Sequence, residues 1–316
     1  MMEEVLRGQP IRVIGCVVSA HAHAQVLAER LRRIWNSADA SGLGWVDGES
    51  PKELAAAMAS AQSTASIPVS CIDAVFVVGG DGFLMETYHA FDGTGLRPLL
   101  IGWNAGHVGF LMNDAPHADD ALQVQLANFR NGVYTTELAY PVCAQVQLRD
   151  GTERTIRAFN EITLRASGRQ AVRLHRWING ADLGVFGGGG FIVATPQGST
   201  AFAGDAGGPL VDPAVPSLVL VPMTTHRARI FAQLHNALVL SPHSSIRVDV
   251  LERDKRPIAV ETETEQITDV DRVLITSAYR HGPSQAIALG YAYAPDGRRF
   301  PARVAKKFIG RIRERH

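Results

Sequence analysis

Cysteine is scarce in this sequence, and long hydrophobic runs are absent. The three cysteines, Cys16, Cys71 and Cys143, lie far apart among the 316 residues. An odd, scattered set favours reduced thiols over a disulfide framework or a zinc site. No apolar run reaches the roughly 20 residues that a transmembrane helix needs, and the first residues resemble a buried strand more than a signal peptide. We therefore expect a cytoplasmic protein.

An excess of charge of either sign is also absent. Lys and Arg together number 31, as do Asp and Glu. No global field therefore attracts nucleic acid or an anionic membrane, and neither is expected as a partner. Hydrophobic residues make up 46% of the chain, which is ordinary for a globular protein, and the length suggests two domains.

The first third alternates between strand-like and helix-like segments. Such alternation predicts an α/β domain with a parallel sheet covered on both faces. A helix is expected over 23–35, because the apolar residues Val26, Leu27, Leu31 and Ile34 recur there at helical spacing. Ser50 and Pro51 are a typical cap and first-turn residue for the next helix. The strands expected here are 11–18, 73–79 and 97–103, and the other helices are 52–62 and 83–91.

From about residue 129 the sequence becomes β-rich. Asp150-Gly151 and Asn179-Gly180 each separate two alternating apolar segments, which predicts two hairpins. A third hairpin is expected around the charged turn within 245–262. We therefore assign 1–128 to the α/β domain and 129–297 to a β-rich domain. The tail, about 298–316, is expected to be an amphipathic helix that buries Val304, Phe308 and Ile312 against the first domain.

The segment FVVGGDGFLMETYH, 76–89, places one carboxylate among three glycines where a buried strand ends. Glycine lets the backbone turn sharply and approach a ligand, and amide groups before a helix suit phosphate. Asp81 could accept a proton from an attacking hydroxyl, hold Mg²⁺, or merely shape the turn. The two common glycine-rich nucleotide motifs, G-x-x-x-x-G-K-[ST] and G-x-G-x-x-G after a strand, are absent.

Three further segments fit nucleotide binding, and two of them also fit a plainer structure, with Asn104 as a turn residue or surface group and 194–209 as a Ser/Gly-rich loop. Asn104 follows a predicted strand and opens a loop that contains Gly106 and Gly109. Asn160 and Glu161, in AFNEITL, can offer a donor and acceptors to sugar hydroxyls. The segment ATPQGSTAFAGDAGGP, 194–209, is dense in hydroxyls and small residues that can surround a ribose or pyrophosphate.

Taken in order, these segments resemble the NAD kinase family, which shares G-G-D-G with a superfamily that includes diacylglycerol kinases and phosphofructokinases. The resemblance covers about 73–240 and rests on G-G-D-G, N-x-G-x-x-G-F-L, F-N-E-I and T-P-x-G-S-T-A. It implies the two-domain fold, a site in the cleft between the domains, and a homodimer or homotetramer. It also implies that the β-rich domain, 129–297, serves NAD binding and oligomerisation. It also implies transfer of the γ-phosphoryl of ATP, or of polyphosphate, to the adenosine 2′-hydroxyl of NAD, with Mg²⁺ or another divalent cation accompanying ATP.

The resemblance also implies roles for single residues. Asp81 corresponds to the catalytic base, and no protein residue is assigned to a metal. Phosphate and nucleotide contacts are expected from Gly79, Gly80, Gly82, Phe83 and Asn104. Contacts to NAD are expected from Asn160, Glu161, Thr195, Ser199, Thr200, Ala201, Phe202 and Asp205.

The sequence departs from the family pattern at three positions. Gly189 stands where the family has an aspartate that binds the nicotinamide side of NAD. Phe202 replaces a tyrosine, and Asp205 stands where a small residue is common. These departures concern the acceptor and leave Asp81 in place. Two alternatives therefore stay open: a kinase of the same superfamily that acts on another nucleoside, sugar or lipid hydroxyl, and a nucleotide-binding protein that does not catalyse.

Overall fold

The computed structural model describes residues 8–37, 42–60, 69–106, 109–225, 236–292 and 299–305. It divides into two compact units, one of Met1–Leu138 with Ile287–His316 and one of Ala139–Ala286. These bounds differ from the predicted 128/129 and 297. The strands β5 (Tyr134–Ala139) and β17 (Ile287–Ala292), which the sequence grouped with the β-rich part, belong to the sheet of the first unit. The strand pattern does not reveal which sheet a strand joins.

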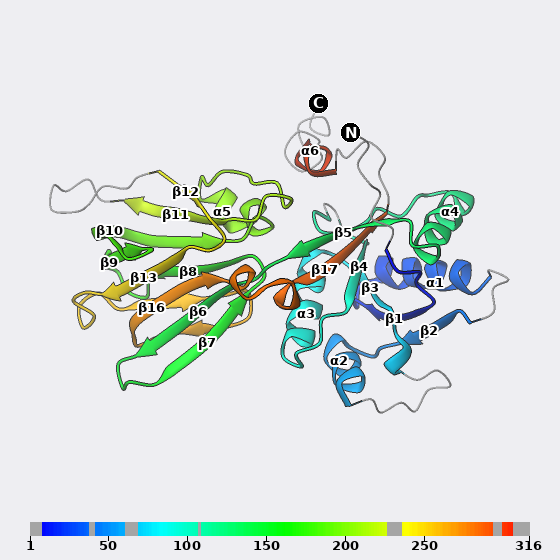
Figure 1. Cartoon of the computed structure of the whole chain (residues 1–316), viewed down its shortest axis with the longest axis horizontal. Helices are drawn as coiled ribbons and strands as arrows, with labels where there is room; N and C mark the ends of the chain where they lie inside the picture. The colour runs from blue at the N-terminus through cyan, green and yellow to red at the C-terminus, as the bar shows by residue number, and fades with distance from the viewer. Residues whose placement is uncertain are drawn as a thin grey trace. The chain divides into compact units, whose positions relative to one another are not determined.

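The first unit has a six-stranded sheet in the order β2-β1-β3-β4-β17-β5 (Figure 1). Neighbouring strands from β2 to β17 run parallel, as the strand–helix alternation predicted. The carboxyl ends of these strands therefore meet at one edge, where open α/β sheets bind ligands. The remaining strands of this sheet are β1 (Val13–Val18), β2 (Gly44–Asp47), β3 (Ala74–Gly79) and β4 (Leu99–Asn104).

Helices cover both faces of this sheet. The helices α1 (Ala22–Asn36) and α4 (Asp119–Arg130) pack on one face, and α2 (Pro51–Ser60) and α3 (Asp81–Asp92) pair with each other on the other face (Figure 1). Ser50 caps α2 as predicted, because its hydroxyl accepts the N–H of Glu53 at 3.2 Å.

The buried side of α1 differs in part from the prediction. Leu31 and Ile34 are buried, but Val26 is 70% exposed. Small Ala24 and Ala28 and the large Trp35 occupy the buried face instead. The aliphatic spacing alone placed the apolar stripe one residue away from the true face, because alanine contributes little to such a pattern and still packs closely against a sheet.

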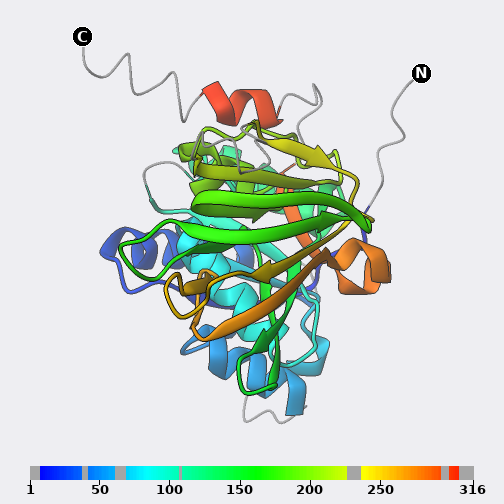
Figure 2. The same cartoon turned by 90° about the vertical axis from the view of Figure 1, so that its left-hand side faces the viewer.

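The second unit is an antiparallel sheet of 11 strands within the described residues. Its green and yellow strands face the viewer in Figure 2. The sheet curls, since β6 and β7 contact β8 and β14 contacts β16, so that one face encloses an apolar core. The strands are β6 (Val142–Leu148), β7 (Glu153–Ala158), β8 (Glu161–Ala166), β9 (Val172–Ile178), β10 (Ala181–Ala194), β11 (Leu218–Thr225), β12 (Leu238–Leu240), β13 (Ser245–Val250), β14 (Ile258–Glu261), β15 (Gln266–Ile267) and β16 (Val270–Ser277).

Two of the three predicted hairpins are confirmed. β6 pairs with β7 across Asp150-Gly151, and β9 pairs with β10 across Asn179-Gly180, where both turn residues have positive φ. The third was wrong: β13 pairs with β9 and β16, whereas β14 pairs with β8 and β15. Their alternation is real, but each strand finds its neighbours far away in the sequence.

The short helix α6 (Arg299–Val304) contacts the first unit. Arg303 donates to the carbonyl of Met112 at 2.6 Å, and Phe300 lies edge-on to Phe110. The predicted burial of Phe308 and Ile312 falls outside the described residues. Among the helices of the described residues, none is both long enough and apolar enough to cross a membrane.

Candidate functional site

The glycine-flanked turn joins β3 directly to α3. Gly80 is the N-cap of α3 and Asp81 its first residue, so the first N–H groups of the helix lie at the carboxyl end of the sheet. A Cβ atom added at Gly80 or Gly82 would meet no atom within 4 Å. The main chain is therefore bare on an open side, as a phosphate-binding turn requires. Gly79, in contrast, is covered by Phe83, whose Cβ would lie 3.0 Å from an added Cβ.

Asp81 connects this turn to the second glycine-containing loop. Its Oδ2 accepts the N–H of Phe110 at 2.7 Å and its Oδ1 accepts the N–H of Leu111 at 2.8 Å. A carboxylate oxygen has two acceptor positions, so each oxygen keeps one for a further partner. The structure thus fixes the direction of this carboxylate and brings two of the four motifs together.

Asn104 shapes the same loop from within. Its amide donates to Asp114 at 3.0 Å, and its oxygen accepts the N–H of Gly106 at 3.0 Å. Buried Asn113 anchors the other end, donating to the carbonyls of Gly102 at 2.9 Å and Gly290 at 3.1 Å. Its oxygen accepts the N–H of Ala292 at 2.8 Å. Asn113 therefore ties the loop to β4 and to β17, a role that the sequence did not reveal.

In the second unit, Asn160 and Glu161 lie at the start of β8. The N–H of buried Asn160 donates to a carboxylate oxygen of Glu263, and its carbonyl accepts the N–H of Thr195 at 2.8 Å. Glu263 was not among the predicted site residues. It lies 103 positions from Asn160 in the sequence, and the only local signal was the alternation of acidic residues in ETETE.

Glu161 sits in an acidic and partly buried environment. Burial, and then the negative charges of Glu263 and Asp205, raise the pKa of Glu161 to about 8. Protonation of this carboxyl is thus favoured near neutral pH. A ligand that donates hydrogen bonds, such as a sugar hydroxyl, would favour the ionised form instead.

A cavity of about 300 Å³ opens beside these residues. Arg165 closes one part of it, because two nitrogens of its guanidinium group donate to the two carboxylate oxygens of Glu261 at 2.5 and 2.8 Å. Phe202, 46% exposed, contributes the aromatic surface. The lining is therefore mostly acidic, with one apolar ring. Its residues are Glu161, Thr163, Arg165, Phe202, Glu261, Thr262 and Glu263.

The hydroxyls predicted to surround a ribose are engaged with backbone groups of their own loop and of the segments packed against it. Thr195 donates to the carbonyl of Phe159 at 2.9 Å. Ser199 donates to Pro196 at 2.6 Å and accepts the N–H of Val211 at 2.9 Å. Thr200 donates to Gln197 at 3.0 Å. All three side chains are buried, so their clearest role is to hold the loop in shape.

Gly198 explains how this loop approaches β8. A Cβ atom there would lie 2.1 Å from the carbonyl oxygen of Asn160, a contact that no side chain allows. The loop can therefore press its backbone against Asn160 only with glycine at this position. Ala201 follows this turn, and Phe202 and Asp205 bound the short helix α5 (Phe202–Asp205). Phe202 and Asp205 are both exposed.

No set of three or more His, Cys, Asp or Glu side chains in the described parts of the chain can hold a metal ion. Mg²⁺ commonly binds through one or two carboxylates together with substrate phosphates rather than in a protein cage. The residues present therefore fit a metal that arrives with a nucleotide. None of the three cysteines forms a disulfide bond.

Comparison with known proteins identifies the family. Residues 159–286 match the family model described as ATP-NAD kinase C-terminal domain. An NAD kinase of Xanthomonas oryzae is 34% identical over 210 residues, 66% of this chain and 76% of that protein. An NAD kinase of Streptococcus pneumoniae is 27% identical over 243 residues, 77% of this chain and 85% of that protein.

Two solved structures share the fold. Yeast NADH kinase complexed with NADH has a TM-score of 0.72 and 17% identity, covering 96% of this chain and 88% of that one. An NAD kinase from Archaeoglobus fulgidus in complex with ATP has a TM-score of 0.65 and 20% identity, covering 95% and 98%. The fold class predicted from the sequence is thereby confirmed. With the identity and coverage found for the Xanthomonas relative, this chain belongs to the NAD kinase family.

Proposed function

We propose that the protein is an NAD kinase, which transfers the γ-phosphoryl of ATP to the adenosine 2′-hydroxyl of NAD. The observation that carries this is the joined pair of glycine loops, in which a carboxylate of fixed direction borders a bare main-chain turn. The relatives named NAD kinase support the choice of reaction.

The donor half belongs to the first unit. The exposed backbone at Gly80 and Gly82 and the N-terminus of α3 suit the phosphates of MgATP. Phosphoryl transfer depends mainly on positioning and charge neutralisation, so amides, Mg²⁺ and one proton acceptor suffice. The 2′-oxygen attacks the γ-phosphorus, the bond to the β-phosphate oxygen breaks, and ADP leaves. Asp81 takes the proton of the attacking hydroxyl with its remaining acceptor positions.

The acceptor half belongs to the second unit. Glu161 offers carboxylate oxygens to the hydroxyls of the adenosine ribose, and Glu263 fixes the backbone of Asn160 beside it. Thr195, Ser199 and Thr200 shape the adjoining loop, and Ala201, Phe202 and Asp205 border it on the exposed side.

The test incubates the pure protein with ATP, Mg²⁺ and NAD and assays NADP. The expected result is NADP formation that the Asp81→Asn variant does not match. No product above that of the variant would refute the proposal. Replacing ATP by polyphosphate and NAD by NADH in parallel reactions defines the donor and the acceptor form. We also propose a homodimer or homotetramer of the cytoplasm, which size-exclusion chromatography with light scattering would test.

A second candidate, a kinase for another hydroxyl acceptor, is favoured by Gly189 and Phe202. Gly189 lies five positions before Ala194, the partner of Glu161 in β10, which is roughly 17 Å along a strand. A carboxylate at 189 could not reach the Glu161 cluster of the same chain. A screen of nucleoside, sugar and lipid acceptors with labelled ATP distinguishes the two functions.

The Gly189→Asp variant, compared with Gly189→Ala, tests this departure directly. A Cβ atom at 189 would lie 3.3 Å from the carbonyl of Met223, so a small shift accommodates either side chain. A sharp gain in NAD use with aspartate, and not with alanine, would mean that the native pocket is not adapted to NAD. If calorimetry instead detects NAD binding without any turnover, the protein is a non-catalytic member of the family.

A further inference from the structure

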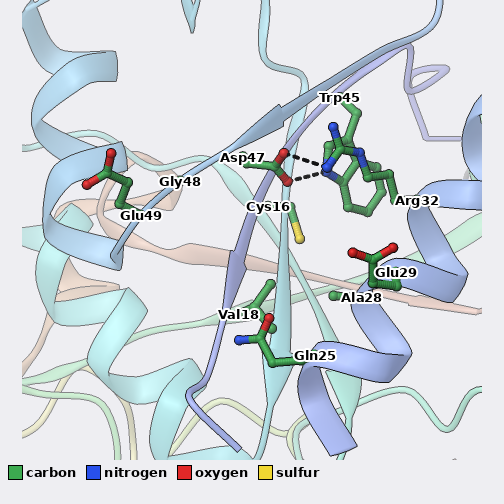
Figure 3. A pocket seen from close by; sticks show the side chains of 10 residues that line it. All are labelled: Cys16, Val18, Gln25, Ala28, Glu29, Arg32, Trp45, Asp47, Gly48 and Glu49. Carbon is green, nitrogen blue, oxygen red and sulfur yellow. Dashed lines mark hydrogen bonds and ion pairs between the residues drawn. The ribbon is translucent and has the colours of Figure 1, made fainter. Parts of the chain in front are cut away.

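A second cavity, of about 330 Å³, lies in the first unit and is separate from the cavity beside Glu161. It opens between α1 and the edge strand β2 on the sheet face that α1 covers (Figure 3). Cys16 and Val18 of β1 form its floor, Gln25, Glu29 and Arg32 of α1 one wall, and Trp45 and Asp47 of β2 the other.

The cavity is connected to the glycine turn through the pairing of β1 with β3. Val18, at the end of β1, is paired with Val78, the residue before Gly79. The N–H of Ser19 donates to the carbonyl of Val78 at 2.9 Å. The cavity and the turn thus occupy the carboxyl ends of neighbouring parallel strands, the edge at which open α/β sheets bind nucleotides. A nucleotide with its phosphates at the turn has this cavity one strand away.

The chemistry of the lining selects a particular part of a ligand. Glu29, Asp47 and Glu49 oppose the single cation Arg32, so the cavity disfavours phosphate and favours groups that donate hydrogen bonds. Glu29 makes no ion pair within the described parts of the chain and lies on the exposed side of α1. Ribose hydroxyls and an exocyclic amino group are such donors.

The aromatic wall is held in place. The indole N–H of Trp45 donates to Asp47 at 2.7 Å, and Arg32 pairs with the other oxygen of Asp47 at 2.9 Å. The ring also lies edge-on to Phe76, with centroids 5.8 Å apart. Figure 3 shows the contacts of Asp47 with Trp45 and Arg32, together with Glu29 and the sulfur of Cys16 around the same space. A fixed indole beside carboxylates suits a base and its sugar.

We propose that this cavity holds the nucleoside end of the phosphoryl donor, with Glu29 accepting hydrogen bonds from the ribose or the base. The proposal rests on the proposed function for the identity of the donor. It assigns the donor phosphates to the turn around Gly80 and the nucleoside to the space between α1 and β2, both within the first unit.

Two measurements test it. The first is tryptophan fluorescence during titration with adenosine, ATP, tripolyphosphate and putrescine. Trp45 is one of four tryptophans, so the Trp45→Phe variant identifies its signal. Adenosine and ATP are expected to change a signal that is lost in Trp45→Phe, whereas tripolyphosphate is not. A change with putrescine and none with adenosine would overturn the proposal in favour of an amine site.

The second measurement is the kinetics of Glu29→Gln. Loss of a charged hydrogen-bond acceptor is expected to raise KM for ATP about 10-fold, and to leave kcat and KM for NAD nearly unchanged. Glu153→Gln, an exposed change on β7 of the second unit, is the matched control. An active kinase whose KM for ATP stays within about twofold in Glu29→Gln would overturn the proposal. If no kinase activity exists at all, the proposed function fails, and the adenosine titration still decides whether the cavity binds nucleosides.

Discussion

The two candidate half-sites, around Asp81 in the first unit and around Glu161 in the second, present different chemical groups to a ligand. In the first unit, the turn around Asp81 presents bare backbone at Gly80 and Gly82, where an added Cβ atom would meet nothing within 4 Å. In the second unit, the site around Glu161 presents carboxylates, and its hydroxyls and its glycine at 198 are used to hold the loop together. Main-chain amides suit an anion such as phosphate, whereas carboxylates suit hydroxyl donors. This division explains how one chain can bind a phosphoryl donor and a sugar acceptor with little positive charge.

The largest effect is expected from Asp81→Asn. Loss of the proton acceptor should lower kcat by about 10²–10⁴-fold with little change in KM for either substrate. Steady-state NADP formation measures this. Asp73→Asn is the matched control, because Asp73 also accepts two backbone N–H groups, those of Arg12 and Val13 at 2.8 and 2.9 Å.

If Asp73→Asn lowers kcat as much as Asp81→Asn does, the carboxylate at 81 only positions the loop. The proposed difference between a donor half-site with a proton acceptor and an acceptor half-site would then not hold. Amide hydrogen exchange at Phe110 and Leu111 then reports how far that loop has loosened in each variant.

Glu161→Gln should weaken the acceptor half selectively. At about pH 9, where the native carboxyl is ionised, KM for NAD is expected to rise about 10- to 100-fold, because a charged acceptor is lost. KM for ATP should stay constant. Equal changes in both KM values would show that the two half-sites do not divide the substrates as proposed.

The pKa of about 8 at Glu161 predicts a pH dependence. KM for NAD should fall by about 10-fold between pH 7 and pH 9 in the native protein, since ionisation no longer has to accompany binding. Stability should show the opposite trend. The folded chain holds this proton more tightly than the unfolded chain, so its contribution is present below pH 4.5 and is lost as the pH rises through about 8.

In Glu161→Gln both trends should flatten. Chemical denaturation between about pH 5 and pH 9 compares the two proteins. An unchanged slope in the variant would mean that burial and the acidic neighbours do not raise the pKa of Glu161.

The smallest effect is expected from a variant of the donor half-site in which the stability of the fold and the binding of ATP change in opposite directions. Gly82→Ala should stabilise the fold by about 0.5–1 kcal/mol, because alanine favours the helix and meets no neighbour. The added methyl stands where phosphate approaches, so KM for ATP should rise several-fold. Thermal unfolding and kinetics measure the two quantities, and a variant that is more stable with unchanged KM for ATP would place the phosphates elsewhere.

The features that the sequence predicts correctly are those that depend on residues close together in the chain. The strand and helix before and after Asp81, the cap at Ser50 and the two Gly-containing hairpins follow from spacing and turn chemistry. Glu263, Asn113 and the partners of β13 and β14 depend on contacts across many residues, which no local pattern contains. The composition of 194–209 predicts a loop rich in hydroxyls, but composition cannot tell whether the hydroxyls of Thr195, Ser199 and Thr200 face a ligand or nearby backbone carbonyls.

The tie made by Asn113 has a consequence for biosynthesis. Its side chain bonds to Gly290 and to Ala292, and these residues emerge from the ribosome after the whole second unit. The edge of the sheet that carries the proposed phosphate site is thus completed only after residue 292 has been made. A shortened product that stops before residue 287 would carry Asp81, the proposed base, and still leave the loop of Phe110 and Leu111 without its anchor at β17.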